Sequence, residues 1–175
     1  MDPDTRSFAE LSKEELLGLL QDAAKNWLAH DGLWFQAVEK THGLDEAIRL
    51  DGETWAHFSR IEAKRIMDRL GLPPGGGIPA LVRALGFRLY AHLNEAETVE
   101  VTPSRCVFRM KTCRVQDSRK RKGLPDFPCK AVGLIEFSGF AEAIDPRIRT
   151  RCVSCPPDRA DGSCWCSWEF TLALT

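Results

Sequence analysis

The feature that most constrains the fold is a long apolar repeat with a clear start and a clear stop. Ser12 and Glu15 have the spacing of a capping box, and Gly43 is a typical residue at a helix end. Between them, apolar residues recur every three or four positions, at Leu16, Leu20, Ala23, Trp27, Trp34 and Val38. This pattern predicts one helix of about eight turns, with a bend near Gly32.

The rest of the first 93 residues also has helical spacing. Asp45 can cap a short helix over residues 46–50, and Asp51 can cap a second one that runs to Leu70. The Pro- and Gly-rich segment 72–77 is the expected hinge. Residues 78–93 return to helical spacing.

From residue 98 the pattern changes to short alternating segments. Strands are predicted over residues 98–102, 106–112, 147–153 and 165–174, and helices over 114–122 and 129–144. We therefore expect an α+β fold, in which N-terminal helices pack on a small antiparallel sheet. A helical part over residues 1–93 and a cysteine-rich α+β part over 94–175 should form one folded domain.

Composition and charge indicate whether the protein binds nucleic acid or membranes. Apolar residues make up 43% of the chain and charged residues 28%, as in a soluble globular protein. The basic run Arg119–Lys122 is too short for the dense basic face of a nucleic-acid-binding protein. No segment approaches the ~20 apolar residues that cross a bilayer, and the first ten residues do not resemble a secretion signal. We expect a cytoplasmic protein that binds neither nucleic acid nor membrane.

All seven cysteines lie between Cys106 and Cys166. Clustered cysteines without a secretion signal favour metal or thiol chemistry. The pairs Cys152/Cys155 and Cys164/Cys166 could flank one turn and hold Zn²⁺. An alternative set combines Cys113 and Cys129 with one thiol from each pair, and the sequence does not choose between them. An iron–sulfur cluster fits the spacing less well, and some of the thiols could instead be small buried apolar groups.

The segment WLAHDGLWF (residues 27–35) places an acid on an apolar helix face. Trp27, Asp31 and Trp34 share that face, and a buried carboxylate needs a partner or a solvated pocket. The next helix offers Trp55, Glu62 and Arg65 at helical spacing. These six residues predict a ligand pocket with aromatic walls, in which Asp31 and Arg65 are the polar anchors. A buried Asp31–Arg65 ion pair that only fixes the helix register is the alternative.

Three segments of the sequence are distinctive: HDGLWF (residues 30–35), IEAKRI (61–66) and CPPD…CWCSWEF (155–170). Together they resemble a family of small cytosolic proteins of anaerobic bacteria and archaea. That family is distantly similar to L-2-amino-thiazoline-4-carboxylic acid hydrolase-like proteins and to the 4-vinyl reductase small-molecule-binding domain. The resemblance implies an α+β ligand-binding fold with a cysteine-containing C-terminal region.

Three functional hypotheses follow. The first is a small-molecule-binding protein with a thiolate metal site. The second is a hydrolase of a small cyclic or amide substrate, in which a metal-bound water or a thiolate attacks with help from His30 or Asp31. The third is a homodimeric interaction module whose tryptophan face is the interface.

Overall fold

The computed structural model describes residues 6–158 and 162–173. The helices are α1 (Arg6–Ala9), α2 (Lys13–His42), α3 (Leu44–Leu70), α4 (Gly77–Leu85), the 3-10 helix η1 (Leu89–His92), α5 (Arg114–Arg121) and α6 (Lys130–Ile144). The strands are β1 (Ala96–Val99), β2 (Arg105–Met110), β3 (Ile148–Ser154) and β4 (Cys166–Leu172). The α+β prediction is confirmed.

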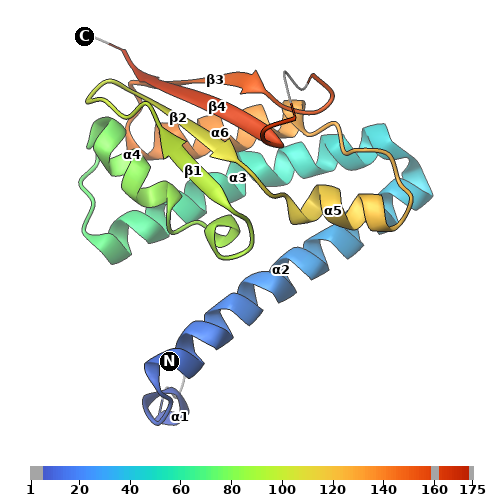
Figure 1. Ribbon diagram of the computed structural model, residues 1–175, viewed down its shortest axis with the longest axis horizontal. Helices are drawn as coiled ribbons and strands as arrows, with labels where there is room; N and C mark the ends of the chain where they lie inside the picture. The colour runs from blue at the N-terminus through green and yellow to red at the C-terminus, as the bar shows by residue number, and fades with distance from the viewer. Residues whose placement is uncertain (1–5, 159–161, 174–175) are drawn as a thin grey trace.

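The four strands form one antiparallel sheet in the order β1-β2-β4-β3. Two hairpins, β1-β2 and β3-β4, lie side by side, because β2 pairs with β4 along its whole length. Helices α3, α4 and α6 pack on one face of the sheet (Figure 1). The N-terminal half of α2 projects away from the sheet and the other helices. The fold therefore has a helical layer on one face of the sheet only.

Three predicted helix boundaries are wrong. Helix α3 is continuous from Leu44 to Leu70, so Asp45 and Asp51 lie inside it and neither is its N-cap. The helix predicted over residues 78–93 ends at Leu85, and η1 follows after Arg88. The break allows Arg88 to enter the protein interior, where only 3% of it is exposed.

The prediction for α2 is correct at both ends. Ser12 and Glu15 form the capping box, with the Ser12 hydroxyl 3.2 Å from the backbone nitrogen of Glu15. The helix runs straight through Gly32, where no bend occurs. Gly43 alone links α2 to α3 with φ at 91°, a conformation that glycine adopts without steric cost.

The two parts expected from the sequence share one core. It combines Ala63 and Met67 of α3, Leu81 of α4, Phe140 of α6 and Trp168 of β4. The segment predicted as a hinge is tied to α6 and the residues after it: the Gly75 nitrogen donates to Ile144, and the Gly77 nitrogen donates to Asp145. Neither the core nor this loop separates residues 1–93 from the rest.

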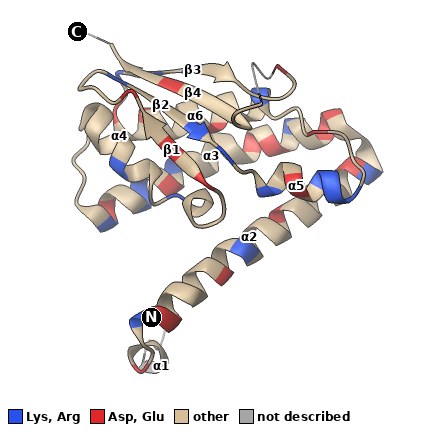
Figure 2. Cartoon of the chain, in the orientation of Figure 1, with Lys and Arg blue, Asp and Glu red and all other residues tan. Residues whose placement is uncertain are grey.

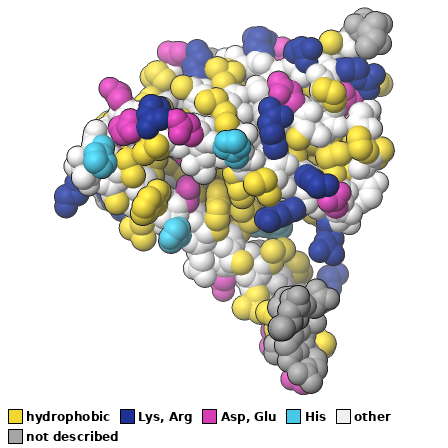
Figure 3. All heavy atoms as spheres, turned by 180° about the vertical axis from the view of Figure 1, so that it is seen from behind, with side chains coloured by type: hydrophobic (Ala, Val, Ile, Leu, Met, Phe, Trp, Pro, Cys, Tyr) yellow, Lys and Arg dark blue, Asp and Glu magenta, His cyan; other side chains and the backbone are white. Residues whose placement is uncertain are grey.

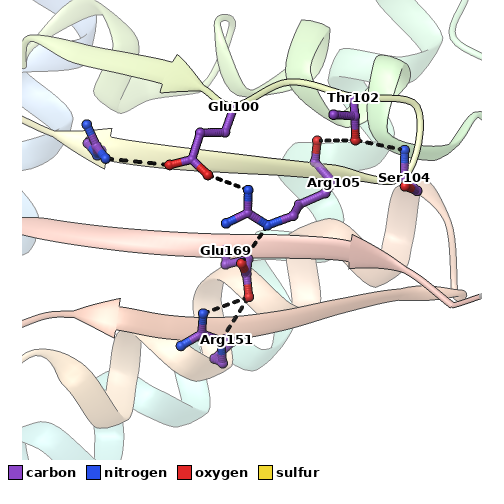
Figure 4. Close-up of polar contacts among 7 residues, drawn as sticks. Glu100, Thr102, Ser104, Arg105, Arg151 and Glu169 are labelled. Carbon is purple, nitrogen blue, oxygen red and sulfur yellow. Dashed lines mark hydrogen bonds and ion pairs between the residues drawn. The ribbon is translucent and has the colours of Figure 1, made fainter.

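The outer face of the sheet carries charge. Glu169 on β4 accepts hydrogen bonds from Arg105 on β2, at 2.7 Å, and from Arg151 on β3, at 2.8 Å. Arg105 also pairs with Glu100, which extends the network across three strands (Figure 4). Because alternate side chains point to opposite faces, the intervening residues of these strands face the helices.

The first turns of α2 are exposed along an apolar row. Leu16, Leu17, Leu19 and Leu20 are 40–51% exposed on the part of the helix that stands away from the body. Apolar side chains on this arm are also visible from behind (Figure 3). None of the helices in the described part of the chain has the length and apolarity needed to cross a bilayer.

Candidate functional site

A cavity of about 400 Å³ opens between α2, α3, α5, α6 and one end of the sheet. Its walls are mainly aromatic and apolar, formed by Phe35, Trp55, Phe127, Val132, Phe137 and Trp168. Such a volume suits a small organic molecule. These wall residues come from α2, α3, the loop before α6, α6 and β4, so the cavity exists only after these elements have packed.

An aromatic cluster holds the α3 wall in place. Trp27 meets Trp55 edge to face, with ring centroids 6.1 Å apart, and stacks on Phe58 at 5.7 Å. Tyr90 of η1 stacks on Trp55 at 5.9 Å. Trp27 thus supports the wall from behind, whereas Trp55 and Tyr90 line the cavity.

Three carboxyl groups line the same cavity: Asp31 of α2, Asp51 of α3 and Glu136 of α6. Burial raises the pKa of Asp31. Burial, together with the charges of Asp31 and Glu136, raises the pKa of Asp51 to about 7. In the described part of the chain, no Arg or Lys forms an ion pair with Asp31 or Asp51. Among the described residues, His30 lies near Asp31 and the Trp55 side chain hydrogen-bonds Asp51, but neither acid has an Arg or Lys partner.

Arg88 is a buried cation that contacts Glu136 at this site. Its guanidinium lies 2.8 Å from Glu62 of α3 and 2.8 Å from Glu136 of α6. Burial and the neighbouring Glu62 raise the pKa of Glu136 to about 7, although Arg88 opposes that shift. The expected Asp31–Arg65 pair does not form, because Arg65 is exposed on α3. Glu62, which periodicity placed in the ligand pocket with Trp55, is buried against Arg88 and does not line the cavity.

Basic side chains surround the entrance. Exposed Lys25, Arg114, Arg121 and Lys122 line the outer part of the cavity. Basic residues occupy both ends of α5, which faces α2 (Figure 2). Arg119 differs from its neighbours: it is buried, and it holds Glu39 of α2 with two hydrogen bonds of 2.7 and 3.0 Å. This fork fixes α5 against α2 and so fixes one side of the cavity.

Four thiols reach the cavity: Cys113, Cys129, Cys155 and Cys166. The sulfur atoms of Cys129 and Cys155 are 3.3 Å apart, and Cys155 also interacts with Cys166. These four match the alternative set rather than the two sequence pairs. Cys152 lies beside Cys155 without lining the cavity.

The expected quartet of Cys152, Cys155, Cys164 and Cys166 is not assembled around the cavity. Strand β4 begins at Cys166, so Cys164 lies outside the strand and is buried away from the cavity lining. Within residues 6–158 and 162–173, no three His, Cys, Asp or Glu side chains are arranged to hold a metal ion. The thiols converge on a cavity but do not form a coordination sphere.

Cys129 has the most distinctive surroundings of the four thiols. It is the N-cap residue of α6, and its sulfur lies 3.7 Å from the side-chain nitrogen of Gln116. Hydrogen bonding from Cys155 lowers the pKa of Cys129, against the opposing effect of burial. The same interaction raises the pKa of Cys155. One thiol of the pair is therefore set to ionise and the other to donate.

Besides Trp27, Glu62, Arg65, Cys152 and Cys164, two more predicted site residues lie outside the cavity lining. Trp34 is 69% exposed on α2, and His30 is exposed beside it. Sequence spacing placed Trp34 with Trp27, but Trp27 packs on Trp55 and Phe58 of α3, whereas Trp34 stays exposed. Neither residue is positioned to act on a molecule in the cavity.

Two lining residues had no sequence signal. Gln116 is buried in α5 and exchanges two hydrogen bonds of 2.9 Å with the backbone of Phe127, which fixes the loop before Cys129. Trp168 is 1% exposed, and its indole nitrogen has no hydrogen-bond partner in the part of the chain that the structure describes. A buried N–H without a partner is costly, so a ligand acceptor at this wall would be favourable.

Comparison with known proteins places the chain in a family. A family model, described as a family of unknown function (DUF6125), matches residues 9–172. No curated protein and no solved structure matches the chain. The matched region includes every wall of the cavity and all seven cysteines. The chain belongs to the DUF6125 family.

Proposed function

We propose that this protein binds a small amphipathic molecule that carries a cationic amine. The observation that carries the proposal is the pair Asp31 and Asp51, two acids on an aromatic cavity with no described Arg or Lys paired to them. A bound ammonium group would neutralise them and could also contact the face of Trp55. The similarity to 4-vinyl reductase-type and thiazoline hydrolase-like domains stays a prediction.

The distribution of charge supports a defined orientation of the ligand. The acids lie on α2, α3 and α6, half-buried or buried, whereas the basic residues Lys25, Arg114, Arg121 and Lys122 are exposed at the rim. A molecule with an amine at one end and an acidic or polar group at the other would satisfy both regions. Apolar walls between them would hold its body.

A matched series of probes tests the proposal. Phenethylamine, 2-phenylethanol and 3-phenylpropionate share a ring and differ in charge at the other end. We expect phenethylamine to raise the melting temperature and quench tryptophan fluorescence at lower concentrations than the other two. The double variant Asp31→Asn/Asp51→Asn should lose that preference and keep its fold. Equal affinity for the amine and the alcohol in the wild-type protein would contradict the proposal.

Zinc binding is a separate proposal. Its ligands would be three or four of the thiols that converge near Cys155, after a local rearrangement. Elemental analysis of protein purified without an affinity-column metal tests it. One zinc or iron per chain supports a thiolate metal site, and less than one in ten chains contradicts it.

Hydrolysis of a small substrate and self-association are the two alternative predictions. A hydrolase would need Cys129 or Asp31 at the reacting atom, since His30 lies outside the cavity lining. A homodimer would cover the exposed leucines of α2 and Trp34. Sedimentation velocity at several protein concentrations tests the dimer.

A further inference from the structure

We infer that Cys129 and Cys155 form a dithiol that exchanges with small disulfides entering the cavity, with Cys129 as the attacking thiolate and Cys155 as the resolving thiol. The inference goes beyond ligand binding, and its preference for amine-bearing disulfides rests on the proposed function. The inference rests first on the distance between the two sulfur atoms, which are 3.3 Å apart at the wall of the cavity of about 400 Å³. A disulfide needs about 2.05 Å, so a small side-chain movement closes the bond.

The backbone holds the two thiols together from segments distant in sequence. The Lys130 nitrogen, in the first turn of α6, donates to the Pro156 carbonyl at 3.1 Å. The Lys130 ammonium also pairs with Asp158 at 2.9 Å, and Cys155 forms an isolated bridge with Asp158. The loop after β3 is thus fastened to the start of α6, which places Cys155 against Cys129.

The surroundings distinguish Cys129 from the other cavity thiols. A thiolate at this position accepts from the Cys155 thiol and from the Gln116 amide. It also lies at the N-terminal end of α6, where the helix dipole favours a negative charge. Gln116 cannot turn away, because both ends of its amide are bonded to Phe127. Only the thiolate form attacks a disulfide, so Cys129 should react first.

The exchange balances without any other reactant. The Cys129 thiolate attacks one sulfur of the small disulfide, a mixed disulfide forms, and one small thiolate leaves. The Cys155 sulfur then attacks the Cys129 sulfur, the protein disulfide forms, and the second small thiolate leaves. The two protons of the dithiol end on the two released thiols, so the protein is oxidised and the small disulfide is reduced.

Neutral 2-hydroxyethyl disulfide tests the dithiol without relying on amine recognition. Reduced protein is mixed with this reagent, quenched with acid, digested with trypsin and analysed by mass spectrometry. We expect a disulfide between peptide 123–130, which holds Cys129, and peptide 152–159, which holds Cys155. The variant Cys155→Ser should stop at the mixed disulfide on Cys129, and Cys129→Ser should slow the first step at least about tenfold.

Three controls keep the assignment falsifiable. Cys113→Ser removes another thiol of the same cavity, and Cys152→Ser and Cys166→Ser remove the two other thiols that interact with Cys155. All three should still form the Cys129–Cys155 disulfide, with melting temperatures showing that each variant is folded. A disulfide within peptide 152–159, a first adduct on another cysteine, or zinc that blocks both thiols would overturn the inference.

The preference for amines is tested with charged disulfides. Cystamine carries an ammonium at each end, and 3,3′-dithiodipropionate carries a carboxylate at each end. We expect cystamine to react at least about tenfold faster, and Asp31→Asn/Asp51→Asn to reduce that ratio towards one. Fast exchange with 2-hydroxyethyl disulfide but no charge preference would leave the dithiol standing and overturn the amine preference. Amine binding without any exchange would overturn the dithiol alone.

Discussion

Gly133 of α6 lies directly against the indole ring of Trp168 on β4. A Cβ atom at Gly133 would be 2.6 Å from the Cζ2 atom of that ring. The ring is fully buried and stacks on Phe137 with centroids 4.8 Å apart, so it has no room to move. This contact sets the distance between α6 and the sheet, and with it the depth of the cavity, which both residues line.

Gly133→Ala should therefore destabilise the protein by about 1–3 kcal/mol, because overpacking against a rigid ring forces the helix away from the sheet. Denaturant unfolding measures the change. Gly32→Ala is the matched control, since nothing lies within 4 Å of its Cβ. There we expect a gain of about 0.5–1 kcal/mol, as for any helix-interior glycine. A neutral Gly133→Ala would show that α6 does not rest on this contact.

Arg88→Met should cost about 3–5 kcal/mol at neutral pH, because it leaves two buried carboxylates without their cation. The loss should shrink as the pH falls below about 7, because Glu136, whose pKa is raised to about 7, becomes neutral in the folded state. Thermal unfolding at pH 5 and pH 8 compares the two conditions. Arg83→Met, an exposed position on α4, is the control and should change little. Equal losses at both pH values would argue against the charge effect.

Asp51 should make the wild-type protein less stable as the pH rises. Its pKa is about 7 in the folded state and near 3.8 when unfolded, so the folded state binds more protons between these values. Stability attributable to this group is greatest at low pH and falls as the pH passes from about 4 to 7. Asp51→Asn should raise the melting temperature at pH 8 and change it little at pH 4. Phenethylamine should reproduce part of that increase.

Arg119→Lys should loosen α5 without removing a charge. Lysine cannot form the two-pronged hydrogen bond with Glu39 or reach the Pro125 carbonyl in the same geometry. We expect a loss of about 1–3 kcal/mol and faster hydrogen exchange in residues 114–121. Arg121→Lys, an exposed residue of the same helix, is the control. Exchange rates that match in the two variants would contradict a role for the fork.

Trp34→Ala should leave phenethylamine binding unchanged, because that side chain is 69% exposed outside the cavity lining. Phe35→Ala, at the next position of α2, should weaken binding by about tenfold through the loss of a cavity wall. Fluorescence titration of both variants gives the comparison. A large loss in Trp34→Ala would mean that the ligand lies on the exposed face of α2.

The sequence by itself determined those helices and strands that depend on residues close together in the chain. The capping box at Ser12 and the glycine at residue 43 set the ends of α2, and alternation in residues 98–174 predicted all four strands. It also placed an acid, Asp31, on the apolar side of α2. Such features depend on neighbours within a few residues, and those neighbours are visible in a linear chain.

Tertiary structure alone decided which of these groups meet. Spacing left two sets of cysteines open, and the attachment of the loop after β3 to α6 brings Cys155 to Cys129, as in the alternative set. Spacing paired Asp31 with Arg65, but that ion pair does not form. Because α4 ends at Leu85, Arg88 lies in the interior and pairs with Glu62 and Glu136. Contacts between residues this far apart depend on how whole helices pack against the sheet, and local periodicity carries no information about that packing.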